Sequence, residues 1–185
     1  RSEWFGCACC PSNICRFIPS MPGYIYARKN DDLYINLYVA GKTTIEVQGT
    51  KLSLEQESKM PWDGKITARL GCDVPVRARL HLRIPSWAEN KSFPGDLYAF
   101  SNPVPGKTVI RINGTKWRYE TDKGYAILNR KWRTGDRIEI EFPFEVRKII
   151  AHPPLLMTVG KRPFSWGRWS IAPNRPIMKI PIFSD

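Results

Sequence analysis

The sequence predicts an all-β fold, a β-sandwich or jelly roll of about ten short antiparallel strands. From Tyr24 onward, short runs alternate between apolar and polar residues, which is typical of strands with one buried face. Gly, Pro, Asn and Asp fill almost every gap between these runs, as expected of tight turns. Helix is expected only as a short piece over residues 12–17, and no amphipathic helix of normal length is expected anywhere.

The first half of the chain contains five candidate strands, at residues 33–39, 43–47, 52–57, 65–70 and 76–84. The fifth alternates strictly between two faces. One face carries Val76, Ala78, Leu80, Leu82 and Ile84, and the other carries Arg77, Arg79, His81 and Arg83. The basic face is expected to be solvated. His81 and His152 are expected to be solvated or packed side chains and not metal ligands.

The second half contains five more candidate strands, at residues 108–112, 116–119, 125–128, 137–142 and 145–150. Asn113-Gly114 separates the first two, and this pair is a strong signal for a β-hairpin because both turn positions need a positive φ. Asp63 and Asp136 are expected to form turns and not to act as an acid/base pair.

Charge is the one unusual property of the composition. Lys and Arg number 29 against 17 Asp and Glu, which gives a net charge of +12. The basic residues are spread over many strands and accompany no nucleic-acid-binding motif, so no nucleic-acid partner is expected. No apolar run approaches the roughly 18 residues of a membrane-spanning helix, so no membrane partner is expected either.

Cysteine usage favours free thiols. Four of the five cysteines lie between residues 7 and 15, which is a poor disulfide framework. Such clustering is more typical of a reducing compartment, a metal site or a catalytic thiol, and it slightly favours the cytoplasm.

A short motif near the N-terminus identifies the family that the chain resembles. Cys9-Cys10-Pro-Ser-Asn13, followed by Arg16, resembles the Cys-Cys-Pro-Pro-Asn-x-x-Arg segment of glycoside hydrolase family 127, the β-L-arabinofuranosidase-like enzymes. Five further landmarks follow in the family's order, at residues 32–38, 60–64, 82–88, 112–114 and 130–136. The resemblance thus covers most of the chain.

The resemblance implies a domain organisation. In this family a helical (α/α) barrel carries the active site and precedes β-sandwich domains. Residues 1–23 would be a Cys-rich remnant of the barrel, 24–155 a β-sandwich domain and 156–185 an irregular tail. The chain is therefore expected to be a fragment, truncated at its N-terminus, that serves as an accessory sandwich.

The tail departs from the family, which continues here with a segment like Val-Ala-x-x-x-Gly-Pro-Leu-Val-Tyr-Cys. Re-reading the codons around Trp166 in a shifted frame permits the Gly-Pro-Leu-Val-Tyr-Cys part of that segment. We hypothesise that residues from about Arg162 onward come from a frameshifted gene.

The resemblance also implies a zinc–thiolate site. The family holds zinc with one glutamate and three cysteines; Cys9 matches the cysteine that is both ligand and proposed nucleophile, and Cys10 matches a second ligand. Zinc keeps a thiol deprotonated, and the thiolate is the nucleophilic form. In a retaining mechanism Cys9 would attack the anomeric carbon of an arabinose-containing glycan, and a separate carboxylic acid would protonate the leaving oxygen.

The remaining zinc ligands and the acid/base glutamate lie upstream of Arg1 in the family's order. Zinc is therefore expected to be absent or incompletely bound in this chain, which would be inactive alone. Two alternatives stay open. One is a free-standing sandwich that binds carbohydrate or a partner chain. The other is a split enzyme in which a separate chain supplies the missing barrel.

Absence of the barrel would expose the surface that packs against it. An apolar patch involving Phe5, Phe17, Ile18 or Tyr24 is predicted, and with it a homo-oligomer or a captured partner. The landmark tryptophans are expected to be core or domain-packing aromatics and not a sugar-binding platform: Trp62, Trp87 and Trp132.

Overall fold

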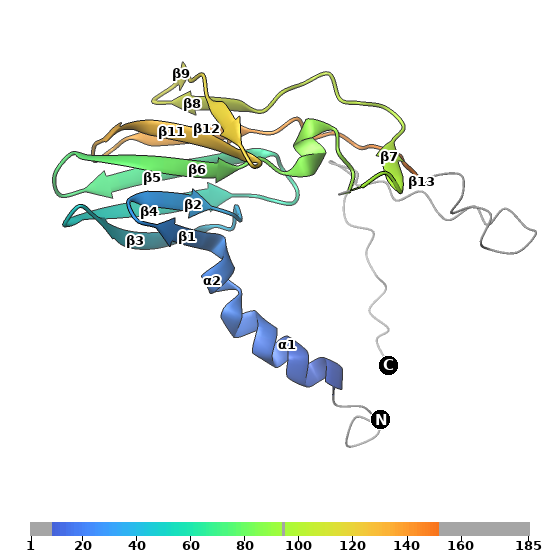
Figure 1. Cartoon of the computed structure of the whole chain (residues 1–185), viewed down its shortest axis with the longest axis horizontal. Helices are drawn as coiled ribbons and strands as arrows, with labels where there is room; N and C mark the ends of the chain where they lie inside the picture. The colour runs from blue at the N-terminus through green and yellow to red at the C-terminus, as the bar shows by residue number, and fades with distance from the viewer. Residues whose placement is uncertain (1–8, 94, 152–185) are drawn as a thin grey trace, which may run out of the picture.

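Two stacked β-sheets preceded by two short helices make up this computed structural model, which describes residues 9–93 and 95–151 (Figure 1). The expected all-β sandwich is confirmed. The predicted tail at 156–185, together with Phe5 and His152, lies outside the described residues. Within the described ranges, no helix is both long and apolar enough to cross a membrane.

The five strands of sheet A are β1 Tyr26–Lys29, β2 Asp32–Ile35, β6 Val76–Arg83, β10 Glu120–Asp122 and β11 Tyr125–Trp132. They are hydrogen-bonded in the order β1-β2-β6-β11-β10. The six strands of sheet B are β3 Gly41–Val47, β4 Thr50–Ser58, β5 Lys65–Cys72, β8 Val109–Ile112, β9 Thr115–Lys116 and β12 Arg137–Glu141. Their order is β3-β4-β5-β12-β8-β9. A small third sheet pairs β7 Tyr98–Phe100 with β13 Ile149–Ala151, and a 3-10 helix, η1, spans Ser86–Glu89.

The core follows from the period-two alternation of the strands. The apolar face of β6 is buried as predicted, and its largest members are less than 1% exposed: Leu80 and Leu82. Inward-facing residues of both sheets join it in one cluster, among them Leu54, Ile66, Leu128, Ile138 and Ile140. Each fully buried aliphatic side chain stabilises the fold by about 1.5–3 kcal/mol relative to an exposed one. This shared core holds the two sheets together.

One strand pair differs from the predicted antiparallel arrangement. β2 and β6 are parallel neighbours, with Leu33 opposite Leu80 and Ile35 opposite Leu82. Between them the chain crosses to sheet B and runs through β3, β4 and β5 before it returns. The chain reverses direction at each of these three strands and once more on its return, so β6 lies in sheet A with the same direction as β2.

Several strand boundaries also differ from the predicted ones. The strand predicted at 33–39 ends at Ile35, and the next residue, Asn36, donates its N–H to the carbonyl of Ile25 in α2 at 2.9 Å. The short strands β1, β7 and β10 were not predicted, since each has three or four largely exposed residues and no alternation. The predicted Asn113-Gly114 hairpin is confirmed by positive φ angles of 52° and 80° between β8 and β9.

The N-terminal helix is longer than predicted. Helix α1 spans Cys9–Ser20, and the four-residue helix α2 spans Pro22–Ile25. Pro11 lies in the first turn of α1, where a missing N–H costs no hydrogen bond, and Pro19 lies one residue before the helix ends. The expectation that no amphipathic helix of normal length exists was wrong. The prolines suggested turns, whereas their positions are compatible with a helix.

The basic face of β6 is not solvated throughout. His81 is only 8% exposed, because Tyr34 stacks on its ring at 4.2 Å between centroids. Its Nε2 lies 3.3 Å from the carboxylate of Asp32, which also accepts a hydrogen bond from Nε of Arg79 at 2.7 Å. The parallel β2–β6 pairing brings these groups together. Of the two predicted environments for His81, solvated or packed, the structure shows the packed one. The prediction of a fully solvated face is wrong.

Tyr38 gives the fold a predicted dependence on alkaline pH. Its buried hydroxyl donates to the carbonyl of Arg83 at 2.7 Å, and burial, reinforced by Tyr125 and partly opposed by Arg83, raises its pKa above the ordinary 10.0. The neutral phenol is thus favoured in the folded state, and this contribution to stability is present in full below pH 10 and is lost progressively above it. We expect the urea midpoint to fall more steeply above pH 10 in the wild type than in Tyr38→Phe. Parallel pH profiles of the two proteins would contradict this assignment.

Candidate functional site

The predicted catalytic motif lies at the start of helix α1, which projects from the edge of the sandwich (Figure 1). Cys9 and Cys10 are its first two residues, and both are exposed. Their Sγ atoms lie 3.7 Å apart. The structure therefore presents two adjacent thiols at a helix end.

This spacing fits a shared metal ion. Two Zn–S bonds of about 2.3 Å that meet at the tetrahedral angle place their sulfurs about 3.8 Å apart. The 3.7 Å between the Sγ atoms of Cys9 and Cys10 is close to that value. The pair can thus occupy two corners of a tetrahedral zinc site, which needs two more donors. Within residues 9–93 and 95–151, no group of three or more His, Cys, Asp or Glu side chains is arranged to hold a metal.

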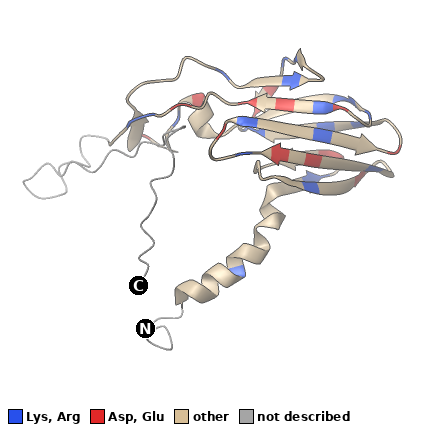
Figure 2. Ribbon diagram, turned by 180° about the vertical axis from the view of Figure 1, so that it is seen from behind, with Lys and Arg blue, Asp and Glu red and all other residues tan. Residues whose placement is uncertain are grey.

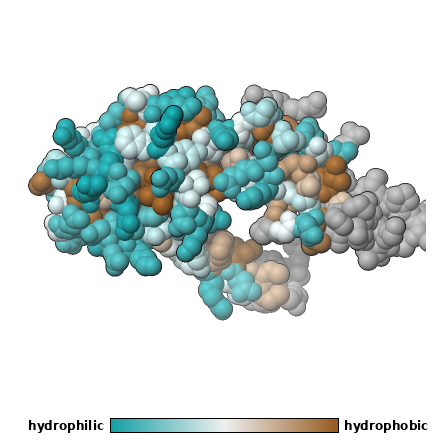
Figure 3. Space-filling view, turned by 45° about the horizontal axis from the view of Figure 1, so that its top comes forward, coloured by the Kyte–Doolittle hydropathy of each residue, from teal (hydrophilic) through white to brown (hydrophobic). Residues whose placement is uncertain are grey.

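The same helix carries an exposed apolar face. Ile14, Phe17 and Ile18 recur at helical spacing on α1, and Phe17 stacks on Tyr24 of α2 with 6.5 Å between ring centroids. Phe17, Ile18 and Tyr24 are each between 56% and 59% exposed, which confirms the predicted apolar patch at these positions. Arg16 is the only charged residue of α1, so the helix is nearly bare of charge in Figure 2 and adds apolar surface beneath the sandwich in Figure 3.

The three landmark tryptophans have different environments. Trp132 is fully buried, and its Nε1 donates to the carbonyl of Ala78 at 3.0 Å, which confirms it as a core residue. Trp87 is partly buried and packs edge-on against Phe142 at 5.5 Å between ring centroids. Trp62 is 67% exposed, so it is not a core residue, and its role as a domain-packing aromatic stays a prediction. It lies in the turn after β4, beyond the alternating pattern that buries strand residues.

The two aspartates predicted to form turns do so. Asp63 accepts the N–H of Lys65 at 3.0 Å. Asp136 is buried and accepts from the N–H of Arg133 at 2.9 Å and from Nδ2 of Asn113 at 2.7 Å, so one carboxylate ties two turns together.

Sequence reasoning missed one buried cation. Arg147 donates to Oδ1 of Asn90 at 3.0 Å and to the carbonyl of Trp87 at 2.5 Å, and its guanidinium lies 3.8 Å from the ring centroid of Phe100. Burial lowers the pKa of Arg147 from its ordinary value. These contacts fasten η1 to β7 and to the chain that enters β13. The apolar–polar alternation of the sequence does not reveal that Arg147 is buried, because the residues that cover it are distant in the sequence.

Comparison with known proteins agrees with the family resemblance of the sequence motifs. Residues 32–144 match the family described as the middle domain of GH127 β-L-arabinofuranosidases. A non-reducing end β-L-arabinofuranosidase of Bifidobacterium longum subsp. longum is 38% identical over 153 residues, which cover 79% of this chain and 20% of the relative.

Two solved structures show the same likeness. A GH127 β-arabinofuranosidase superposes with a TM-score of 0.75 at 41% identity, over 83% of this chain and 24% of that one. A GH127 β-L-arabinofuranosidase from Geobacillus stearothermophilus T6 gives a TM-score of 0.68 at 35% identity, over 83% of this chain and 22% of that one. The chain thus spans about a fifth to a quarter of the length of these relatives.

Proposed function

The chain belongs to glycoside hydrolase family 127, and from that premise we propose that it is part of a β-L-arabinofuranosidase with Cys9 as the nucleophile. The observation that carries the proposal is the pair of thiols at Cys9 and Cys10, 3.7 Å apart, just upstream of the matched sandwich. The Bifidobacterium relative is named for action at the non-reducing end. We propose the same substrate class, a glycan that ends in β-L-arabinofuranose.

Cys9 and Cys10 would hold a zinc ion together with donors from elsewhere in the polypeptide. The ion, when bound, would keep the coordinating thiols deprotonated. Domain residues 1–23 would be the end of the (α/α) barrel that supplies the remaining donors, and 24–155 the sandwich that supports it. The spacing of the two sulfurs supports a metal ion shared by Cys9 and Cys10.

The proposed chemistry is a double displacement at the anomeric carbon. The Cys9 thiolate forms a C–S bond there while the glycosidic C–O bond breaks, and the leaving oxygen takes a proton from a carboxylic acid in the barrel. Water then attacks the same carbon and gives its proton to the carboxylate left by the first step, the electron pair returns to sulfur, and arabinose is released with its configuration retained. This chain contributes the nucleophile and depends on the barrel for the acid.

The exposed apolar residues of α1 and α2 support this dependence. Exposed Phe17, Ile18 and Tyr24 would be covered by the rest of the catalytic domain, or by a second copy of the chain where that domain is missing. We propose the cytoplasm as the location, because the mechanism requires reduced thiols.

A segment exchange tests the proposal. Residues 9–151 replace the matching segment of the Bifidobacterium arabinofuranosidase, and the chimera and this chain are assayed on 4-nitrophenyl β-L-arabinofuranoside with zinc measured by mass spectrometry. We expect the chimera to hydrolyse the substrate with about one zinc per chain, and this chain alone to do neither. An inactive but folded chimera, or hydrolysis by this chain alone, would contradict the proposal.

A further inference from the structure

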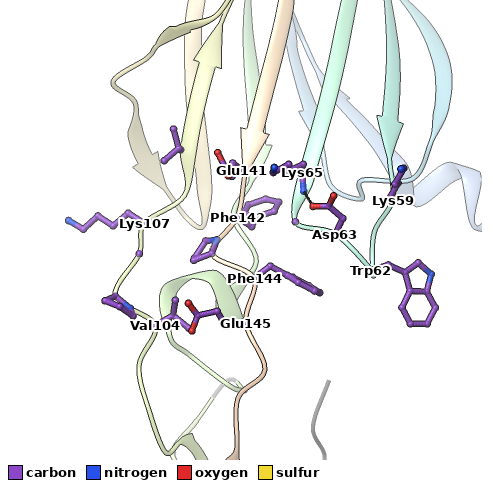
Figure 4. Close-up of a pocket in the computed structure, with 15 residues that line it drawn as sticks. Lys59, Trp62, Asp63, Lys65, Val104, Lys107, Glu141, Phe142, Phe144 and Glu145 are labelled. Carbon is purple, nitrogen blue, oxygen red and sulfur yellow. Dashed lines mark hydrogen bonds between the residues drawn. The ribbon is translucent and has the colours of Figure 1, made fainter. Parts of the chain in front are cut away.

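A pocket of about 770 Å³ lies at the end of the sandwich where β4 ends and β5 begins (Figure 4). Three segments line it: the turn after β4, the loop at 104–109 and the chain that leaves β12 at 141–145. Its volume is within the range of about 300–1,000 Å³ that is usual for small-molecule sites. None of its lining residues belongs to helix α1.

The turn that forms one wall is held rigidly. Trp62 donates its N–H to the carbonyl of Lys59 at 2.8 Å, and Phe142 donates its N–H to the carbonyl of Gly64 at 2.9 Å. A Cβ on Gly64 would lie 2.9 Å from the carbonyl oxygen of Phe142 and 3.0 Å from Cβ of Phe144. Only glycine allows so close an approach. The wall is therefore preformed.

This turn holds an indole in solvent. Trp62 is 67% exposed and, in Figure 4, projects clear of the strands at the rim of the pocket. A large exposed aromatic face carries a cost in apolar surface unless a ligand or another part of the protein covers it. Such a face suits a ligand with one flat apolar side and polar edges. The C–H face of a sugar ring has this character.

Charged groups line the other walls of the pocket. The lining includes Lys59, Lys65, Lys107, Asp63, Glu141 and Glu145. Glu141 pairs with Arg111 at 3.2 Å and lies opposite Lys65 across the β5–β12 pair. An apolar protein surface that covered these charged groups would remove their hydration, which is unfavourable. Hydroxyl groups, in contrast, both donate to carboxylates and accept from ammonium groups.

We infer that this pocket binds an oligosaccharide, with one sugar ring stacked on Trp62 and its hydroxyls hydrogen-bonded to the lysines and carboxylates of the lining. This inference is independent of the chemistry proposed for Cys9. It gives the sandwich a glycan-binding role of its own, in contrast to the core or domain packing that the sequence predicts for Trp62.

Calorimetric titration of this chain tests the inference with two probes, a neutral arabino-oligosaccharide and an oligogalacturonate. We expect saturable binding of at least one probe, at least about tenfold weaker in Trp62→Ala and retained in Trp62→Phe. Phe93→Ala removes an exposed aromatic residue outside the pocket and should leave binding unchanged.

The two probes separate the kinds of sugar. Binding of the neutral probe, insensitive to salt, identifies a neutral glycan, and binding of the acidic probe alone, weakened by salt, identifies a uronic-acid glycan held by the lysines. Absence of binding to both probes overturns the inference. Equal binding by the wild type and Trp62→Ala also overturns it, as does self-association of the chain that Trp62→Ala abolishes without any sugar binding.

Discussion

Replacing Cys9 with serine in the complete chimeric enzyme is expected to lower kcat/KM by at least about 1000-fold, equivalent to about 4 kcal/mol of transition-state stabilisation. A serine hydroxyl is a much weaker nucleophile than a thiolate and a poor zinc ligand. The variant should also lose zinc, since one of the two closely spaced sulfurs is gone. Steady-state hydrolysis and metal content measure both effects.

Cys15→Ser is the matched control for this experiment. Cys15 is an exposed cysteine of the same helix, but six residues separate it from Cys9, which places it on another side of α1. Its replacement should change kcat/KM and zinc content less than about twofold. Equal losses in the two variants would show that the helix responds to any change, and an active Cys9→Ser enzyme would remove Cys9 from the chemistry.

Trp132→Ala is expected to destabilise the sandwich by about 3–5 kcal/mol. The indole is fully buried between the sheets, and its Nε1 donates to the carbonyl of Ala78 on the neighbouring strand. Alanine leaves a cavity and removes that hydrogen bond. Because small domains are stable by only about 5–15 kcal/mol, this loss is a large fraction of the total. Urea unfolding followed by far-UV circular dichroism measures it.

Trp62→Ala provides the comparison within the same residue type. Two thirds of the surface of Trp62 is exposed to solvent. Its replacement by alanine should therefore change the free energy of unfolding by less than about 0.5 kcal/mol. Trp132→Phe keeps a ring in the core and should give an intermediate loss. Equal unfolding midpoints for Trp132→Ala and Trp62→Ala would contradict the placement of Trp132.

Local patterns in the sequence determined most of the secondary structure. The alternation in β6 identified its buried face, and Asn113-Gly114 identified a hairpin whose turn has the required positive φ angles. Both signals depend on neighbouring residues alone. Helix α1 was underestimated because Pro11 and Pro19 suggest turns until their positions at the two ends of the helix are known.

The candidate site could be predicted only in part. The Cys9-Cys10 motif indicated the family and the type of chemistry, but the sulfur spacing that fits a shared metal is a property of the folded helix. The pocket beside Trp62 was missed because its walls come from three segments that are distant in the sequence.

The sequence by itself therefore determined the all-β class, the turns and the motif of a family-127 fragment. The tertiary structure decided the parallel pairing of β2 with β6, the burial of His81 beside Asp32, and the opposite environments of Trp62 and Trp132. The physical reason is that periodicity and turn preferences arise from adjacent residues. Burial depends on which distant segment covers a side chain, and long-range pairing sets that.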